Sequence, residues 1–355
     1  MTTIQSLRIL IVADFARSKA QRTFFSVERK LANGFIRLGH NVVCFSDRDT
    51  ARESSFFGSS KHGSGKMNTR LIETAEQYQP HIILVGHADL ISGTTYSALR
   101  DKVRGVRLAQ FNVDPTFRPE TMATFAQRTA WVDKSFITTA DSEAIAAIQP
   151  PASNVHFFPN PVDSSVETGR VFEKDRESLE LDLLFLGTGI GTRNEQLDAL
   201  DSRLPENVRR RFSGGIHGSP RISGCAFLRA LETAAQNLNT PIDDRRPEAF
   251  LYSSDRIALL LGQGTLVHTS AAAHLETLYE DGLVIFSSRE ELAENVIALT
   301  KDDERRRAIA AKGWQIAHSR TNGTRIAKYM LETLLEKTLS EDYGWPTREL
   351  SSSRK

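Results

Sequence analysis

Short apolar runs alternate with stretches of helical periodicity along this chain. The runs have the length of strands, and in the segments between them apolar residues recur every three or four positions. This alternation is typical of βαβ units and predicts an α/β fold with mostly parallel sheets. The expected strands cover residues 8–13, 41–46, 81–86, 107–112, 135–139 and 155–158 in the first half, and residues 181–187, 211–214, 249–252, 265–269 and 283–286 in the second.

Capping residues mark the clearest helices. The first predicted helix covers residues 20–38, and Gly39 suits its C-terminal cap. Ser288 followed by Glu291 forms a capping box that begins a later helix. Residues 325–339 form a final amphipathic helix.

The length of the chain points to two domains. Its 355 residues exceed the roughly 250–300 residues at which one hydrophobic core stops growing. The segment Pro159–Asp163 contains two prolines, which fix the backbone and suit an interdomain hinge. We predict an N-terminal α/β domain over residues 1–163, a linker over 164–180, a C-terminal α/β domain over 181–340 and a flexible tail over 341–355.

Charge and cysteine content narrow the class of protein. Lys and Arg total 45 against 44 Asp and Glu, so no global field favours nucleic acid as a partner. The two cysteines, Cys44 and Cys225, have no nearby Cys or His, which indicates a reducing compartment and no structural zinc. The early apolar run at residues 9–13 is too short for a signal peptide or a membrane span. We therefore expect a cytoplasmic protein.

Two runs of arginine leave room for a membrane contact. Arg209–Arg211 and Arg305–Arg307 are either solvated helix faces or contacts with an anionic membrane surface. Both interpretations stay open, so a peripheral location at the inner face of the membrane does too. The sequence does not specify an oligomeric state.

The strongest chemical signal lies in residues 251–281. A helix opening at Ser253 or Ser254 would place Arg256 in its first turn, where free backbone N–H groups attract an anion. Glu276 follows the next strand beyond its carboxyl end, where open α/β sheets hold their ligands. A carboxylate there can accept both hydroxyls of a ribose. We predict a nucleotide held by its diphosphate at the helix start and by its sugar at Glu276.

Two other segments are candidates for binding the same nucleotide. Gly187 and Gly189 follow a strand and could let a phosphate approach backbone N–H groups, while Arg193 adds a charge-assisted hydrogen bond. A plain tight turn is the alternative for this segment. His268 lies near the carboxyl end of its strand and is either a donor contact or a hydrogen-bonded core residue.

The stretch 251–281 resembles the C-terminal half of GT-B glycosyltransferases, in particular the CgeB-like and family 1/4-like groups. Its counterparts of the family motif are Asp255-Arg256, the turn at 262–264, the strand at 265–269 and the segment 274–279. The resemblance implies two Rossmann-like domains facing across a cleft and a last helix that crosses back to the first domain. It assigns the acceptor to the domain at 1–163 and the nucleotide-sugar donor to the domain at 181–340. Many retaining members carry an earlier glutamate where this chain has Ala258-Leu259-Leu260, so retention and inversion both stay open.

Polar residues at strand ends of the first domain are candidates for acceptor chemistry. Asp14, His87 and Asp114 each follow a predicted parallel strand, so their side chains should meet at one edge of the sheet. An inverting enzyme needs a general base for the acceptor hydroxyl, and any of the three could serve. The alternative is that the two aspartates cap turns and His87 is a loop residue.

A metal ion is not expected. Asp47-Arg48-Asp49 has the spacing of a metal-binding D-x-D motif, but it follows a strand of the first domain, away from the nucleotide signals. We interpret it as a solvated loop. The prediction therefore includes no metal and no cofactor, with a nucleotide sugar as co-substrate.

These features predict a glycosyltransferase that moves a sugar from a nucleotide-sugar donor to a hydroxyl of a glycan, a lipid-linked sugar or a small acceptor. Bacterial envelope polysaccharide synthesis is the pathway that the resemblance suggests. Two alternatives stay open: a nucleotide-sugar epimerase of the same fold, and a non-catalytic protein that binds a nucleotide or a glycan.

Overall fold

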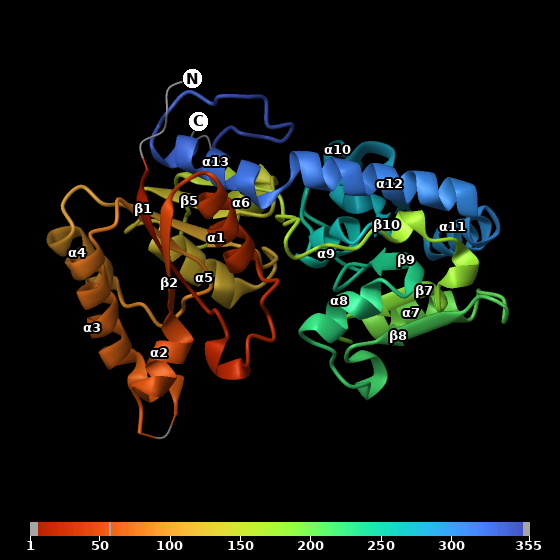
Figure 1. The fold of residues 1–355 in the computed structure, drawn as a ribbon, viewed down its shortest axis with the longest axis horizontal. Coiled ribbons are helices and arrows are strands. Elements are labelled where there is room, and N and C mark those ends of the chain that lie inside the picture. The colour runs from red at the N-terminus through yellow and green to blue at the C-terminus, as the bar shows by residue number, and fades with distance from the viewer. Residues whose placement is uncertain (1–5, 57, 351–355) are drawn as a thin grey trace. The chain divides into compact units, whose positions relative to one another are not determined.

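The computed structural model describes residues 6–56 and 58–350, and the chain divides into two compact units (Figure 1). The first unit contains Met1–Pro159 and Gly323–Lys355, and the second contains Asn160–Asn322. The chain therefore leaves the first unit after Pro159 and returns to it at Gly323. The two crossing segments run side by side, because the Val162 N–H donates to the Thr321 carbonyl at 3.0 Å.

The first unit is built on a parallel sheet of six strands in the order β2-β1-β3-β4-β5-β6. Alternate residues of β1 face opposite sides of the sheet, and both sides are buried, which explains its continuous apolar sequence. The strands match the predicted positions to within a residue or two. They are β1 (Arg8–Ala13), β2 (Asn41–Ser46), β3 (Ile82–Val85), β4 (Arg107–Asn112), β5 (Lys134–Ile137) and β6 (Val155–Phe157).

The last helix of the chain packs on the first helix within this unit. The two helices approach so closely that a Cβ atom on Gly34 would lie 2.2 Å from the Gly323 carbonyl oxygen. The expected return of the final helix to the first domain is confirmed. The first helix begins at Val27 rather than at residue 20. The helices of this unit are α1 (Val27–Arg37), α2 (Asp47–Glu53), α3 (Ser60–Tyr78), α4 (Gly93–Lys102), α5 (Pro119–Arg128), α6 (Ser142–Ala146) and α13 (Gly323–Leu334), with a short 3-10 turn η1 (Arg17–Lys19).

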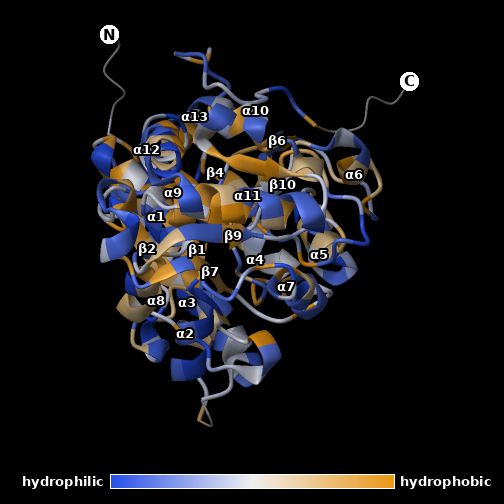
Figure 2. Cartoon of the chain, turned by 90° about the vertical axis from the view of Figure 1, so that its right-hand side faces the viewer, coloured by the Kyte–Doolittle hydropathy of each residue, from blue (hydrophilic) through white to orange (hydrophobic). Residues whose placement is uncertain are grey.

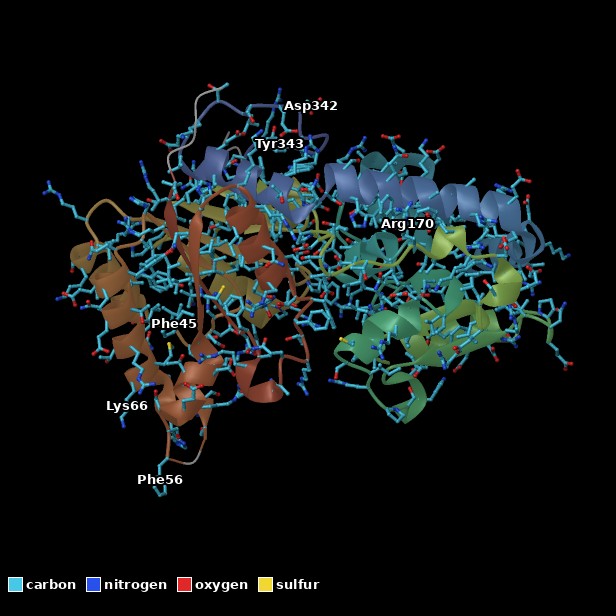
Figure 3. The ribbon with its side chains drawn as sticks, viewed as in Figure 1. Phe45, Phe56, Lys66, Arg170, Asp342 and Tyr343 are labelled. Carbon is cyan, nitrogen blue, oxygen red and sulfur yellow. The ribbon has the colours of Figure 1, made fainter. Side chains whose placement is uncertain are left out.

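Residues 341–350 belong to the packed structure, although the sequence suggested a flexible tail from residue 341. Tyr343 and Trp345 are buried, and the Tyr343 hydroxyl donates to Glu332 of α13 at 2.8 Å (Figure 3). The Leu350 N–H donates to the carbonyl of Val155 in the edge strand β6. Burial of two large aromatic rings fixes this segment. The rest of the predicted tail, residues 351–355, lies outside the described residues.

The second unit is also a parallel sheet, with five strands in the order β11-β10-β9-β7-β8. The strand at its centre, β9, is absent from the predicted set, and the predicted strand at residues 249–252 is a turn. The apolar pattern does not predict β9, because this strand contains the polar residues Gln236, Asn237 and Asn239, all of which are buried. The strands are β7 (Leu181–Leu186), β8 (Arg210–Ser213), β9 (Ala234–Asn239), β10 (Leu266–Ser270) and β11 (Val284–Phe286).

Helices cover this second sheet as well, and the hydropathy colouring of the chain shows apolar residues mostly in the interior and polar residues mostly on the outer surfaces (Figure 2). The predicted capping box at Ser288 is present, since its hydroxyl accepts a hydrogen bond from the Glu291 N–H. The helices are α7 (Arg193–Asp201), α8 (Cys225–Leu231), α9 (Arg256–Gly262), α10 (Glu276–Tyr279), α11 (Arg289–Lys301) and α12 (Asp303–Arg320). Short 3-10 turns are η2 (Val171–Glu173), η3 (Arg176–Ser178), η4 (Ile216–Gly218), η5 (Ala271–Ala273) and η6 (Glu280–Gly282).

The segment expected to be a linker, residues 164–180, packs into the second unit. Val171 and Leu179 are buried and form a small cluster with Ala235 of β9. Arg176 makes a two-pronged ion pair with the buried carboxylate of Asp182 at 2.7 and 3.0 Å. These contacts explain why a stretch with many charged residues is nevertheless fixed.

The arginine runs serve the fold to a larger extent than the sequence suggested. Arg209 pairs with Asp182, and Arg306 is fully buried against Asp303 and the Lys174 carbonyl. Neither side chain is part of a solvated helix face. Within residues 6–56 and 58–350, no helix combines the length and the apolar character that a membrane crossing requires.

Candidate functional site

Parallel strands bring the predicted site residues to the carboxyl ends of the two sheets. In the second unit, Arg256 is the central side chain. It is 7% exposed, its Nη2 donates to the Thr240 carbonyl at 3.1 Å, and its guanidinium lies 4.7 Å from the ring centre of Phe185. Burial, followed by the positive charge of Arg193, lowers the pKa of Arg256 to about 9. The structure thus holds a guanidinium in a place that disfavours its charge.

The Arg256 side chain has unused binding capacity. Its Nε is buried without a hydrogen-bond partner, and no ion pair involves it among the residues that the structure describes. An arginine in this state is suited to an anion that enters from outside, because the anion would restore the missing partner. The planar guanidinium matches the oxygens of a phosphate as it does those of a carboxylate.

Gly187 makes room for Arg256. A Cβ atom at this position would lie 2.6 Å from Arg256 Nη1. The N–H groups of Gly187 and Gly189 donate to the carbonyls of Ser213 and Gly215, so they have acceptors inside the unit. The prediction that these amides bind a phosphate is therefore corrected. Gly187 contributes instead by lacking a side chain, which leaves space for the Arg256 guanidinium.

Arg193 lies beside Arg256 at the start of α7. Its guanidinium donates to the carbonyls of Thr188, Thr240 and Pro241 at 3.2–3.4 Å and lies 5.8 Å from the ring centre of Phe185. The structure thus brings the two predicted arginines to the same ring and to the same Thr240 carbonyl. The two guanidinium groups therefore form the positive region that the sequence suggested.

Ser253 and Ser254 lie in the segment before α9, so the helix opens later than the predicted start at one of these serines. The Ser253 hydroxyl and carbonyl both accept hydrogen bonds from the Asn160 side-chain amide, at 3.2 and 2.9 Å. The Ser254 carbonyl accepts from the Ile257 N–H. Asp255 is the N-cap residue, so the helix begins directly at Arg256. Ser253 therefore helps to fix the turn that presents Arg256.

Glu276 is the first residue of α10, beyond the carboxyl end of β10, as predicted. One carboxylate oxygen lies 3.1 Å from Nδ1 of His274, and the other, Oε2, is buried without a partner. His274 has a left-handed backbone with φ of 53°, a conformation that suits the glycine found here in the resembling family. The prediction that Glu276 binds a ribose stays a prediction.

His268 is a core residue. It is fully buried in β10, and its Nε2 lies 2.8 Å from Oε1 of Gln236. Burial lowers the pKa of His268 to about 3, so the ring is neutral. Gln236 in turn donates to Thr300 of α11. The expectation of a donor contact is corrected here, because the imidazole completes a buried polar network instead.

A cavity of about 240 Å³ opens at the carboxyl ends of β9, β10 and β11. Thr240 and Pro241 line it, and these are the residues whose carbonyls accept hydrogen bonds from the two arginines. Glu248 and Ser270 add polar groups to its wall. No local sequence pattern predicts this cavity, because its residues come from α7, α11 and loops that are far apart in the chain.

In the first unit the structure brings His87 and Asp114 together. His87 Nδ1 lies 3.8 Å from Asp114 Oδ2, and each side chain is about a quarter exposed, at 27% and 24%. The Asp114 N–H donates to the Asn112 side chain at 2.6 Å, and Asp114 Oδ1 accepts from Arg118 at 3.1 Å. A histidine next to an accessible carboxylate is an arrangement suited to general base catalysis.

Asp14 lies in an ion-pair network at the same edge. Arg48 lies between two carboxylates, 3.5 Å from Asp14 and 3.0 Å from Asp89. Arg128 also contacts Asp89 at 3.3 Å and donates to the Ala88 carbonyl at 2.7 Å. Asp14 further accepts from the Ala16 N–H, which is the capping role that the sequence left as an alternative. This aspartate is therefore occupied by the fold.

Asp47 and Asp49 are fully buried, so the interpretation of this segment as a solvated loop was wrong. Both lie in the first turn of α2. Burial disfavours the charged form of Asp49, but hydrogen bonds from Ser18 and Ser46 outweigh it and lower its pKa to about 2. Both carboxyl oxygens of Asp47 lack a hydrogen-bond partner, and burial raises its pKa to about 6. Among the described residues, no group of three or more acidic, His or Cys side chains has the geometry to hold a metal ion.

Solved structures that are similar to this chain share its GT-B fold. Sucrose-phosphate synthase from Thermosynechococcus elongatus has a TM-score of 0.66 at 13% identity, covering 93% of this chain and 98% of that one. HepE from Anabaena in complex with UDP-glucose has a TM-score of 0.58 at 13% identity, covering 93% and 100%. A glycosyltransferase from Rickettsia africae has a TM-score of 0.57 at 11% identity, covering 94% and 99%. At these identities the likeness concerns the fold.

The family comparison adds the class of enzyme. Residues 193–332 match the model of a family described as glycosyl transferase-like. No curated protein matches the chain. The predicted GT-B fold and the glycosyltransferase class are thus confirmed, the first by the solved structures and the second by the family match. The narrower resemblance to the CgeB-like group stays a prediction.

Proposed function

We propose that this chain transfers a sugar from a nucleoside diphosphate sugar to a hydroxyl group of an acceptor. The observation that carries the proposal is the buried guanidinium of Arg256, which has no carboxylate partner among the described residues and lies at the carboxyl end of β7. A diphosphate would supply that partner. A further argument is the structural neighbour HepE, which was solved with UDP-glucose.

The chemistry follows from where charge develops. When the bond between the sugar and the diphosphate breaks, its electron pair stays on the diphosphate, and Arg256 with Arg193 would stabilise the charge that grows there. In an inverting reaction His87, beside Asp114, would take the proton of the acceptor hydroxyl. The proposal requires no metal ion and no resident cofactor.

The acceptor is part of the proposal too. A glycan, a lipid-linked sugar and a small molecule all present the hydroxyl that this chemistry needs. The resemblance to the CgeB-like group favours an acceptor from bacterial envelope polysaccharide synthesis. A peripheral contact with the inner face of the membrane would then bring the enzyme to a lipid-linked acceptor.

A panel of nucleotide sugars with mixed acceptors tests the proposal. We expect release of a nucleoside diphosphate that depends on an acceptor, and we expect Arg256→Met to lower kcat/KM by about 10²–10³-fold, as removal of one anion-stabilising group does. Arg203→Met is the matched control, since Arg203 is an exposed arginine of the same unit that pairs with Glu290.

The other outcomes separate the alternatives. An isomerised donor without transfer would indicate an epimerase. Saturable binding of a nucleotide sugar without turnover, across the panel, would indicate a non-catalytic binding protein. Equal activity of the Arg256→Met variant and the wild type would remove the basis of the proposed donor site.

A further inference from the structure

The cavity of the second unit has the size and the wall of a site for a single ring system. Its volume of about 240 Å³ is below the roughly 300–1,000 Å³ of pockets that hold drug-sized ligands. Part of its wall is apolar and is formed by Leu197 and Leu200 of α7 and Leu292 of α11, while polar and charged residues form the rest. A cavity that combines apolar surface with hydrogen-bonding groups suits a heterocyclic base.

The cavity adjoins the arginine pair through one short backbone segment. Thr240 and Pro241 line the cavity, and their carbonyls accept hydrogen bonds from Arg256 and Arg193. A nucleotide whose phosphates lie at the arginines therefore has this cavity close to its base. The inference below rests on the proposed function, because it concerns the same donor.

One carboxyl group on the cavity wall is available to a ligand. Asp244 is already bound, since Arg289 donates to it at 2.5 Å and the Thr192 hydroxyl at 2.6 Å. Glu248 differs, because Ser270 is the partner of its carboxyl group while its Oε2 atom is buried without a hydrogen bond. No ion pair involves Glu248 among the described residues. Each carboxylate oxygen has two lone pairs, so the group can accept further hydrogen bonds.

We propose that Glu248 selects the base of the donor and that this base is guanine. An ionised carboxylate only accepts hydrogen bonds, and guanine presents two adjacent donors, its N1–H and its 2-amino group, which match the two oxygens. Uracil presents one N–H between two carbonyl oxygens, and those oxygens repel a carboxylate. Adenine presents an acceptor next to its amino group, which leaves one carboxylate oxygen without a donor.

Calorimetric titration of the full chain with GDP and with UDP tests this inference. We expect GDP to bind at least about ten-fold more tightly than UDP, a difference of about 1.4 kcal/mol. Glu248→Gln keeps the shape of the side chain but replaces one acceptor by a donor, so it should weaken GDP binding by about ten-fold or more and leave UDP binding within about two-fold. Glu294→Gln, an exposed glutamate of α11, is the matched control and should change neither affinity.

A second variant tests the cavity itself. Ala272 lines the cavity and is exposed, so Ala272→Trp should fill the space without disturbing the core and should weaken binding of both nucleotides. Tighter or equal binding of UDP, full GDP affinity in Glu248→Gln, or unchanged affinities in Ala272→Trp would each overturn the assignment while leaving the proposed function in place. Absence of binding by any nucleoside diphosphate or nucleotide sugar would overturn both.

Discussion

The carboxyl ends of the two sheets differ in how their arginines are paired. In the first unit Arg48 and Arg128 both contact the carboxylate of Asp89, so each cation there has an anionic neighbour. In the second unit Arg256 contacts a backbone carbonyl and the ring of Phe185 instead. A buried cation without an anion lowers the stability of the folded chain. The two arginines of the first edge thus find an anion within the chain, whereas Arg256 forms no ion pair with the described residues, and an anionic ligand would supply that partner.

The largest effect is expected at His87, because the comparison assigns the accessible chemistry of the first edge to it. His87→Ala should lower kcat by about 10²–10⁴-fold, the range that a positioned general base contributes. Steady-state kinetics with saturating donor would measure this, and His62→Ala, an exposed histidine of α3, serves as the control. A loss below about two-fold would show that the base lies elsewhere and that the first edge has no catalytic histidine.

Asp47 is the exception at the first edge and gives the next prediction. Its pKa is raised from 3.8 to about 6, so its ionisation costs folding free energy as the pH rises from about 4 to about 6, and the cost is complete above that range. Asp47→Asn removes this cost. The free energy of unfolding of Asp47→Asn minus that of the wild type should therefore be about 3 kcal/mol larger at pH 8 than at pH 4.

Its neighbour Asp49 provides the control with the opposite sign. Because its pKa is lowered to about 2, its ionised form stabilises the fold above about pH 4, and that stability is lost as the pH falls toward 2. Asp49→Asn should therefore destabilise the chain at pH 7. Denaturant unfolding at several pH values measures both variants. Parallel pH curves for Asp47→Asn and the wild type would contradict the assignment of an unfavourable buried charge.

The smallest effect concerns stability and compares the two edges directly. Arg128→Met should cost about 1–3 kcal/mol, because it leaves the buried Ala88 carbonyl without its donor. Arg256→Met should leave the unfolding midpoint unchanged or raise it, since the Thr240 carbonyl keeps Arg193 as a donor. Thermal unfolding without ligand measures the pair. Equal losses in the two variants would mean that Arg256 serves the fold as Arg128 does.

Most of the fold could be predicted from the sequence because apolar runs mark strands that are buried on both faces. β1, β2 and β4 have the predicted bounds. β9 was missed for a physical reason: Gln236 and Asn239 find hydrogen-bond partners far along the chain, as when Gln236 bonds His268 and Thr300. A pattern rule treats such residues as exposed, and only the folded sheet shows that they are buried.

The candidate site was predictable in its residue types but not in its contacts. Arg193 and Arg256 were expected from a strand end and a helix start, and the structure brings them to one carbonyl. The space that Gly187 leaves for a guanidinium depends on a residue distant in the sequence, so no local pattern reports it. Glu248 lies in a loop without periodicity, and only the cavity around it singles it out.

The discontinuous first unit has a consequence for how the protein is made. A ribosome completes residues 1–159 long before it reaches α13, so the surface of α1 that receives this helix stays uncovered while the whole second unit is being synthesised. Gly34, which permits the close contact between the two helices, lies on this uncovered surface of α1. The nascent amino-terminal half therefore acquires its final packing only when the last stretch of polypeptide emerges.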